Sequence, residues 1–547
     1  MSEREPNGKD SRLKPTSAVL DEMHLGDIHG AFGTIRVSDV APRRTWRRRI
    51  LTLLAVLGPG IIVMVGDNDA GGVTTYSQAG QDFGYSLLWT LLLLVPVLIV
   101  NQEMVVRLGA VTGVGHARLI KERFGKFWAA FSVGDLFILN FLTIATEFVG
   151  VKQSSEYFGM SKWLVVPLAA GILIGITASG NFRRWERAMF VFLGISLLVI
   201  PLAVMAHPDP GAATRGFLIP SIHGGFTSTA ALLIIAIVGT TVAPWQLFFQ
   251  QSNVIDKRIT PRWFAYEKAD TVIGSVVVVI GASAIIMATA SVFSGTREFG
   301  NFSDALSVAL GFRQHNSYLL GAIYAVLLFD ASIVGASAVT LATSYAFGDI
   351  FGIRHSLHRG FREAKLFYGM YAGMVVVAAA LVLVSNDYLA SLITVAVQAL
   401  AGVLLPSASV FLVLLCNDID VLGPWVNKPW LNIVATVIVS VLLELSLILI
   451  ISTIFTSIDV TRLVVVLTAI LIIAMVVAAV LIVRSPARAP QMSADEKANW
   501  RMPALALLQP AKWSLGRRIA VLAMQVYLGI AVLLLVVKAV QIALGHH

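Results

Sequence analysis

The sequence predicts an all-α polytopic membrane protein, and three observations lead to this fold class. Hydrophobic residues make up 57% of the 547 residues and charged residues only 13%, whereas a soluble globular chain has roughly 25% charged residues. The mean hydropathy is +0.79. Apolar segments of about 20 residues, the length at which a helix crosses a bilayer, recur along the chain. We therefore expect one compact membrane unit rather than several soluble domains.

Twelve apolar segments predict membrane spans, and a thirteenth segment has two possible assignments. The spans are 50–80, 85–108, 127–151, 162–180, 188–206, 229–252, 269–293, 316–347, 367–385, 388–416, 431–454 and 460–483. Residues 517–541 are long and apolar enough either for a further span or for an interfacial helix.

The basic residues of the loops predict the orientation. Alternate loops are rich in lysine and arginine, for example 118–126, 183–187 and 354–365. Because such loops lie mostly in the cytoplasm, we expect a cytoplasmic N-terminus, and the net charge of +9 gives no reason to expect a nucleic-acid partner. Residues 1–45 are polar and predict a flexible cytoplasmic tail, whereas 485–547 predict a cytoplasmic linker followed by the open thirteenth segment.

The first span contains two carboxylates beside a group of small residues. After an apolar run from Ile50 to Val65, residues 66–72 read Gly-Asp-Asn-Asp-Ala-Gly-Gly. Charge and unwound backbone at membrane depth are costly and are tolerated mainly inside the protein or beside a wet cavity. We expect the helix to break over 69–72. Asp67 and Asp69 then suit a hard cation that takes oxygen ligands.

A second interrupted span lies in a matching place. Residues 239–246 of the sixth span read Gly-Thr-Thr-Val-Ala-Pro-Trp-Gln, and Pro244 alone would indicate only a kinked buried helix. The two breaks are five spans apart, and an odd number of spans gives the second half inverted topology. Paired breaks of this kind indicate the binding site of an inverted-repeat transporter. The predicted units are the repeats 46–206 and 207–418, followed by spans 11 and 12 in 419–484.

At this point the chain resembles the Nramp family of divalent-metal transporters. Four segments between about 58 and 418 carry the resemblance: Gly58-Pro59-Gly60, Phe-Gly-Tyr-Ser-Leu-Leu-Trp at 83–89, the pattern from Gln102 to Gly113, and Gln398 with Leu405-Pro406. The resemblance implies the LeuT-like fold, with two inverted repeats of five spans plus extra C-terminal helices. It also implies that a metal binds between the broken spans 1 and 6.

The chain departs from the family at the metal ligands. The family has Asp-Pro-Gly-Asn on span 1 and Met-Pro-His on span 6, where this chain has Asp-Ala-Gly-Gly ending at Gly72 and Ala243-Pro244-Trp245. Without the asparagine and the thioether, we expect a wider, oxygen-only site that suits hydrated Mg²⁺, with Mn²⁺ as a further substrate. This pattern resembles the divergent branch of Nramp-related magnesium transporters.

The proton path of the family is altered as well. Ile144 stands where the family has an aspartate on span 3, and Trp245 and Gln250 occupy its two histidine positions on span 6. A proton relay needs titratable groups along a path. We therefore expect uncoupled, downhill uptake of Mg²⁺. The alternative is proton-coupled transport of Mn²⁺ or Fe²⁺ on the same fold.

Eight residues are candidates for the metal site, and each has another reading. Asp69 is a ligand or accepts hydrogen bonds from freed backbone amides, and Asp67 lines the pocket or points to water. Gln398 reaches the metal or bonds another helix. Glu147 is a pocket carboxylate, a remnant of the proton path or part of a structural pair. The other candidates flank the break in span 6, where they donate backbone or side-chain oxygens or else only cap and pack: Gly239, Thr240, Ala243 and Gln246.

Other function classes are not indicated. The chain has no P-loop, no HExxH motif and no dinucleotide fingerprint, so we expect neither an enzyme nor a cofactor. The paired acids would repel the carboxylate of an amino-acid substrate, and the single cysteine, Cys416, excludes an internal disulfide framework. The expected partners are the transported Mg²⁺ and the lipid bilayer, without an obligate protein partner. His355 and His358 are expected in a solvated loop, and Glu103 and Arg107 as a structural pair.

Overall fold

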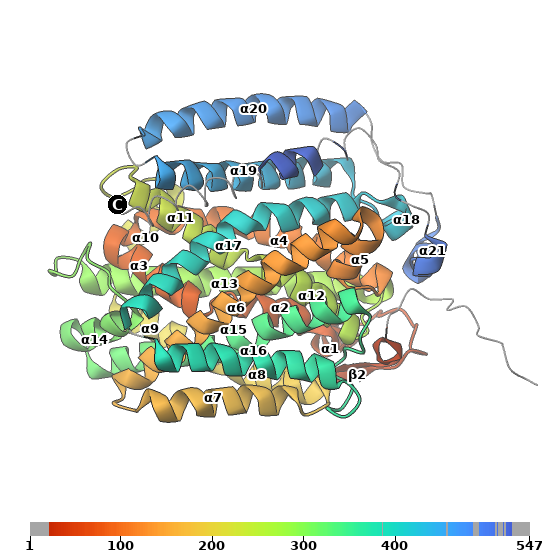
Figure 1. Cartoon of the computed structure of the whole chain (residues 1–547), viewed down its shortest axis with the longest axis horizontal. Coiled ribbons are helices and arrows are strands. Elements are labelled where there is room, and N and C mark those ends of the chain that lie inside the picture. Colours follow the sequence, from red (N-terminus) through yellow and green to blue (C-terminus); the bar gives the residue numbers. More distant parts are fainter. Residues whose placement is uncertain are drawn as a thin grey trace, which may run out of the picture.

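The computed structural model describes residues 21–385, 387–455, 458–484, 492–508, 511, 518 and 521–527. This part of the chain is a bundle of long helices with one small β-hairpin (Figure 1). Nine of its helical segments are long and apolar enough to cross a membrane, or up to eleven if each of two bent pairs is one span. The chain is therefore the all-α, multi-pass membrane protein that its composition predicts.

The first five predicted spans fall on helices. Span 1 consists of α1 (Trp46–Val56), α2 (Pro59–Val65) and α3 (Ala70–Phe83), and α1 and α2 are bent by 55° against each other. The following elements are η2 (Gly84–Leu87), α4 (Leu88–Thr112), α5 (His116–Phe124), α6 (Lys126–Tyr157), α7 (Lys162–Thr177), α8 (Phe182–Ser196) and α9 (Val199–Ala206).

The remaining spans also fall on helices. The elements are α10 (Pro210–Leu218), α11 (Ser228–Thr241), α12 (Pro244–Asp256), η3 (Pro261–Trp263), α13 (Phe264–Phe293), α14 (Ala305–His315), α15 (Tyr318–Phe351), α16 (Lys365–Val384), α17 (Asp387–Cys416), α18 (Ile419–Leu422), η4 (Gly423–Trp425), α19 (Pro429–Ile454), α20 (Val460–Arg484), α21 (Ala494–Asn499) and η5 (Leu505–Leu507). Most of the open segment 517–541 lies outside the described residues, apart from 518 and a helical stretch at 521–527.

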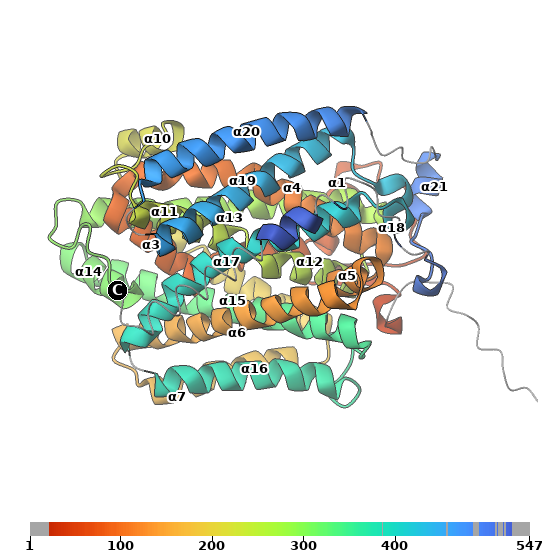
Figure 2. The same cartoon turned by 45° about the horizontal axis from the view of Figure 1, so that its top comes forward.

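The broken spans 1 and 6 occupy the middle of the bundle. α19 and α20 cover one flank and α7 and α16 the opposite flank, in both views (Figure 1 and Figure 2). α10 and α14 lie at one end of the long helices, and α1 lies with β2 at the other (Figure 1). The site predicted at the two breaks thus lies between these two flanks and away from both ends.

The expectation of a flexible tail is wrong for residues 21–45. They form η1 (Glu22–His24) and an antiparallel hairpin of β1 (Ile28–Gly30) and β2 (Gly33–Ile35), in which Ile28 pairs with Ile35. Both isoleucines are buried and pack with Ala55 and Val56 of α1. The burial arises from contacts with segments far along the chain, which a short polar-looking sequence does not reveal.

The N-terminal segment also covers the loop of two histidines that were expected to be solvated, and His355 is buried there while His358 is half-buried. His355 is 3% exposed, and His24 of η1 lies with its Nε2 3.2 Å from the His355 carbonyl oxygen. His358 Nε2 lies 3.0 Å from the carbonyl oxygen of Asp256 at the end of α12. The prediction for this loop is therefore wrong, because the N-terminal segment covers it.

The predicted pair of Glu103 and Arg107 is confirmed. Arg107 Nη2 lies 3.1 Å from Glu103 Oε2, one helical turn away on α4. The same guanidinium donates to the carbonyl of Trp425 and to Asn427 Oδ1, both at 2.6 Å. The arginine thereby fastens α4 to the segment that precedes α19.

Candidate functional site

The breaks of spans 1 and 6 face each other. The unwound residues are 66–69 between α2 and α3, and 242–243 between α11 and α12. α3 packs against α11 and α2 packs against α12. Tyr76 of α3 and Thr241 of α11 are joined by a hydrogen bond of 2.8 Å between their hydroxyls. The two interruptions that were paired on sequence grounds are thus neighbours in space.

The first break lies one turn earlier than predicted, because Asp69 caps α3. Its backbone is extended, and its Oδ1 accepts a hydrogen bond of 2.7 Å from the Gly72 N–H. An aspartate at this position satisfies a free amide of the first helical turn. Gly71 and Gly72 therefore begin the helix instead of interrupting it. The hydrogen-bonding role considered for Asp69 is present at this carboxyl oxygen.

Glu147 of α6 reaches the same break. Its Oε2 accepts a hydrogen bond of 3.0 Å from the Ala70 N–H, so its carboxyl lies beside the residue that follows Asp69. α15 approaches both acids through Gly335, where a Cβ would lie 2.7 Å from Asp69 Cβ and 2.8 Å from Glu147 Oε2. Two carboxyl groups close to each other cannot both ionise readily unless a proton or a cation lies near them.

Gln246 of α12 joins the two breaks. Its Nε2 donates to Asp67 Oδ1 and to the carbonyl of Thr241, the latter at 3.1 Å, and its Oε1 accepts from Gln102 Nε2 at 2.8 Å. Asp67 is 0% exposed, so it does not take the water-facing alternative in this structure. Gln102 was missed as a site residue. Its position as a polar side chain on the apolar span α4 is the signal that could have found it.

Thr240 and Gln398 lie beside the first turn of α3. A Cβ at Gly72 would be 3.1 Å from Thr240 Oγ1, and one at Gly71 would meet Gln398 Nε2 at 1.7 Å. Neither polar atom has a hydrogen-bond partner among the described residues. Their buried, unmet hydrogen-bonding capacity fits a role at the site, which stays a prediction.

Gly239 and Ala243 have packing and capping roles in this structure. A Cβ at Gly239 would lie 2.4 Å from the Gln398 carbonyl oxygen, so the glycine allows α11 to pack closely on α17. Ala243 is the N-cap of α12, and its carbonyl accepts from the Gln246 N–H at 3.2 Å. Donation of either carbonyl to a metal remains a prediction.

No basic side chain balances the acids at the breaks. Within the described part of the chain, Asp67, Asp69 and Glu147 have no lysine, arginine or histidine as an ion-pair partner. Asp67 Oδ2 and Glu147 Oε1 also lack any hydrogen-bond partner there. Buried carboxylates without a counter-charge are costly, so the group must hold protons or a cation.

The described residues contain no group of three or more His, Cys, Asp or Glu side chains with the geometry of a metal site. A cation at the breaks would therefore combine carboxylate oxygens with the neighbouring amide, hydroxyl or carbonyl oxygens. These are hard ligands, of the kind that Mg²⁺ and Ca²⁺ take.

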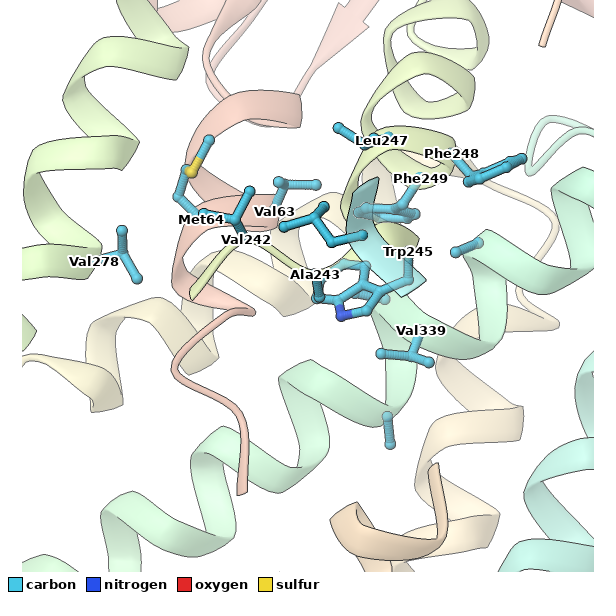
Figure 3. Close-up of a cluster of buried hydrophobic side chains, with 14 of the residues drawn as sticks. Val63, Met64, Val242, Ala243, Trp245, Leu247, Phe248, Phe249, Val278 and Val339 are labelled. Carbon is cyan, nitrogen blue, oxygen red and sulfur yellow. The ribbon is translucent and has the colours of Figure 1, made fainter. Parts of the chain in front are cut away.

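The thioether of Met64, at the end of α2, faces α13. Met64 Sδ accepts a hydrogen bond of 3.8 Å from Ser275 Oγ of α13. In Figure 3, Val242 and Ala243 lie between Met64 and Trp245, among other apolar side chains. Neither Ala243 nor Trp245 offers the sulfur or the imidazole that the family pattern has at these positions.

The extra space expected from small residues is filled at two of the glycines of the first break, Gly66 and Gly72. A Cβ at Gly72 would lie 2.6 Å from the Asp67 carbonyl oxygen, because the chain itself fills that space. The buried Trp245 ring lies 3.4 Å from the position of a Cβ at Gly66. Close packing has thus replaced the volume of the missing side chains.

Comparison with known proteins gives one family and one fold. The Nramp family model, described as natural resistance-associated macrophage protein-like, matches residues 60–452. The divalent metal cation transporter MntH of Latilactobacillus sakei is 26% identical over 427 residues, which is 72% of this chain and 89% of the relative. MntH of Xylella fastidiosa is 27% identical over 456 residues, with 80% and 91% covered. The manganese transporter of Eremococcus coleocola has the same fold, with a TM-score of 0.60 at 19% identity over 82% of this chain and 99% of the other.

Proposed function

Because the chain belongs to the Nramp family, we propose that it transports divalent metal cations across the membrane through the site between the breaks of spans 1 and 6. The observation that carries this proposal is the set of three buried acids, Asp67, Asp69 and Glu147, without a basic partner in the described chain. A divalent cation supplies two positive charges to acids that have no basic partner in the described residues. The names of the relatives, divalent metal cation transporters, support the same class of substrate.

The transported ion has two candidates with different support. The fold neighbour is named a manganese transporter, which favours the alternative, a transition metal such as Mn²⁺. The donor atoms of this chain favour Mg²⁺, since they are carboxylate, amide and hydroxyl oxygens and the Met64 thioether faces α13. Soft ligands select transition metals, whereas Mg²⁺ takes oxygen ligands and keeps several waters. We propose that Mg²⁺ is a substrate and that Mn²⁺ is carried as well.

We propose that this transport is not coupled to protons. Ile144 and Trp245 are buried and apolar where the resemblance expects titratable groups, and Gln250 donates to Thr271 Oγ1 at 3.0 Å. A proton that left Glu147 would find no titratable side chain at these three positions. The ion gradient and the membrane potential then drive uptake, the potential contributing about 2.3 kcal/mol per charge per 100 mV.

The test is uptake into proteoliposomes that contain a Mg²⁺-sensitive dye and, in parallel, a pH-sensitive dye. We expect Mg²⁺ entry without acidification, and loss of entry in Asp69→Asn. The matched control is Asp330→Asn, because Asp330 is another buried carboxylate of the bundle but accepts its hydrogen bond from Ser196. Acidification that follows Mn²⁺ entry, with no Mg²⁺ signal, would instead establish the proton-coupled alternative.

A further inference from the structure

A cavity of about 590 Å³ lies beside the first turns of α1 and α13, apart from the transport site. It combines strongly basic and apolar side chains in one open surface pocket. Its wall includes Arg43, Arg49, Arg262, Ile50, Leu53 and Ala265. Neither the proposed transport nor the packing of the core uses this space.

The two walls of the cavity run in the same direction. Near its mouth the Arg43 guanidinium lies 4.8 Å from the centre of the Trp263 ring. Further along both segments, the Gly60 N–H donates to Asp270 Oδ2 at 2.8 Å. Residue 43 is thus beside residue 263, and residue 60 is beside residue 270. The segments 43–60 and 263–270 therefore run into the bundle in the same direction.

Because the two segments run in the same direction, the basic side chains of the cavity wall lie at one end and the apolar side chains at the other. Arg49 and Arg262 precede Leu53 and Ala265 on their respective segments, so the arginines lie toward the end of the bundle and the apolar side chains lie deeper. A phospholipid has the same division, with a charged head at the membrane surface and an acyl chain toward the centre. An inorganic anion would leave the apolar half of the cavity unused.

The described residues neutralise the positive charge around the cavity only in part. Among the described residues, Arg49 of the wall has no ion-pair partner, and neither have three arginines close to it in the sequence: Arg44, Arg47 and Arg48. Two arginines of the wall do have one, since Arg43 pairs with Asp39 at 2.8 Å and Arg262 Nη2 lies 3.5 Å from the exposed Asp495. The surplus positive charge attracts a negatively charged headgroup.

We propose that this cavity binds one anionic membrane phospholipid. Its phosphate lies between Arg49 and Arg262, because the planar guanidinium matches the geometry of phosphate oxygens. One acyl chain lies along Ile50, Leu53 and Ala265. The exposed Trp46 at the start of α1 lies where interfacial tryptophans meet the headgroup layer.

Native mass spectrometry of the full chain in detergent tests the proposal, with phosphatidylglycerol, phosphatidylcholine or inorganic phosphate added separately. We expect one phosphatidylglycerol to be retained in preference to phosphatidylcholine. Arg49→Gln with Arg262→Gln lowers the affinity about fivefold for each arginine removed, the usual effect of one basic residue on anionic lipid. Ala265→Trp fills the apolar half and lowers retention with every charge kept.

The matched control is Arg184→Gln with Arg362→Gln, two exposed arginines outside the cavity wall, which leaves retention unchanged. Three results overturn the proposal. One is equal retention of the two lipids, and another is displacement of phosphatidylglycerol by an equal concentration of inorganic phosphate. The third is a loss in the arginine variant with none in Ala265→Trp, which indicates diffuse surface attraction. If the arginine variant fails to fold, Ala265→Trp alone decides, since its residue is exposed at the cavity wall.

Discussion

Two groups of buried charges in this chain have similar burial but opposite partners. Between the breaks, Asp67 and Glu147 are 0% exposed and have no basic partner in the described residues. At the hairpin end, the side chains of Lys257 and Glu186 are also 0% exposed, but Lys257 Nζ lies 2.6 Å from Glu186 Oε1. The other oxygen of Glu186 accepts from the Ala31 N–H at 2.5 Å.

The difference separates a structural charge from a ligand-binding one. Asp270 belongs with the hairpin group, since its carboxylate accepts from the backbone amides of Gly58, Gly60 and Ile61 at 2.8 to 3.2 Å. These acids have their hydrogen-bonding capacity filled by the protein and hold the start of span 1 in place. The acids at the breaks have oxygens without a partner among the described residues, so an ion from solution can bind to them. Burial alone therefore does not distinguish these two groups of acids, whereas their partners do.

The largest expected effect follows from breaking the ion pair of Lys257 with Glu186. Lys257→Met leaves Glu186 buried without its counter-charge, which destabilises a protein by about 3–5 kcal/mol. We expect the variant to unfold at a clearly lower temperature than the parent chain, both in detergent. Lys257→Met combined with Glu186→Leu should recover most of the loss, because neither charge then remains. If Lys257→Met alone were as stable as the parent chain, the pair of Lys257 with Glu186 would not have the structural role argued for it.

At the breaks, removing a charge is expected to leave the stability unchanged or to raise it. Asp67→Asn removes one uncompensated charge and keeps an oxygen that can accept from Gln246, so we expect unchanged or higher thermal stability, by about 1 kcal/mol. Metal uptake into proteoliposomes should nevertheless fall at least about tenfold, since a charge-assisted contact contributes roughly 1.5–3 kcal/mol. Loss of stability together with uptake would place Asp67 among the structural charges, beside Glu186.

A smaller change should alter ion preference without changing the fold. Ala243→Met places a thioether at the break of span 6, next to the acids, where this chain otherwise has oxygen donors. We expect the ratio of Mn²⁺ to Mg²⁺ uptake to rise by about fivefold, the factor that corresponds to roughly 1 kcal/mol. Ala243→Leu, similar in volume but without sulfur, is the control. An equal shift in both variants would show that volume, not ligand chemistry, sets the preference.

Much of the fold and the centre of the site could be predicted from the sequence, because their signals are local. Twelve apolar segments and two interruptions, five spans apart, are visible without any structure. The position of the first break was misplaced by a turn. Gly71 and Gly72 have low helix propensity, but the capping carboxylate of Asp69 allows a helix to begin with them. Propensity alone does not distinguish a helix that stops from one that starts.

The remaining features depend on contacts between distant segments. The hairpin at 28–35 is joined to the bundle through the Ala31 N–H, which donates to Glu186, and the preceding Met23 carbonyl accepts from Arg258 at 2.8 Å. Gln102 belongs to the site because α4 passes Gln246. The expected pocket volume failed for the same reason, since neighbouring backbone fills the space that small residues leave. No pattern within one span carries this information.

The smallest effect is expected at the ion pair of Asp21 with Arg359, beside the hairpin. Burial by itself raises the pKa of the Asp21 carboxyl, but hydrogen bonds from Arg359 and from the Met23 N–H outweigh it and lower the pKa to about 2. A folded-state pKa below the ordinary value of 3.8 means that the pair stabilises the hairpin above that pH. The contribution is lost as the pH falls through about 2. We expect hydrogen exchange of the 21–35 amides, corrected for intrinsic rates, to accelerate roughly threefold over this window, as for a pair near a protein surface. Arg359→Gln should show the faster exchange already at neutral pH and a flat profile below it. A parent chain with a flat profile would show that the apolar contacts of Ile28 and Ile35 alone hold the hairpin on α1.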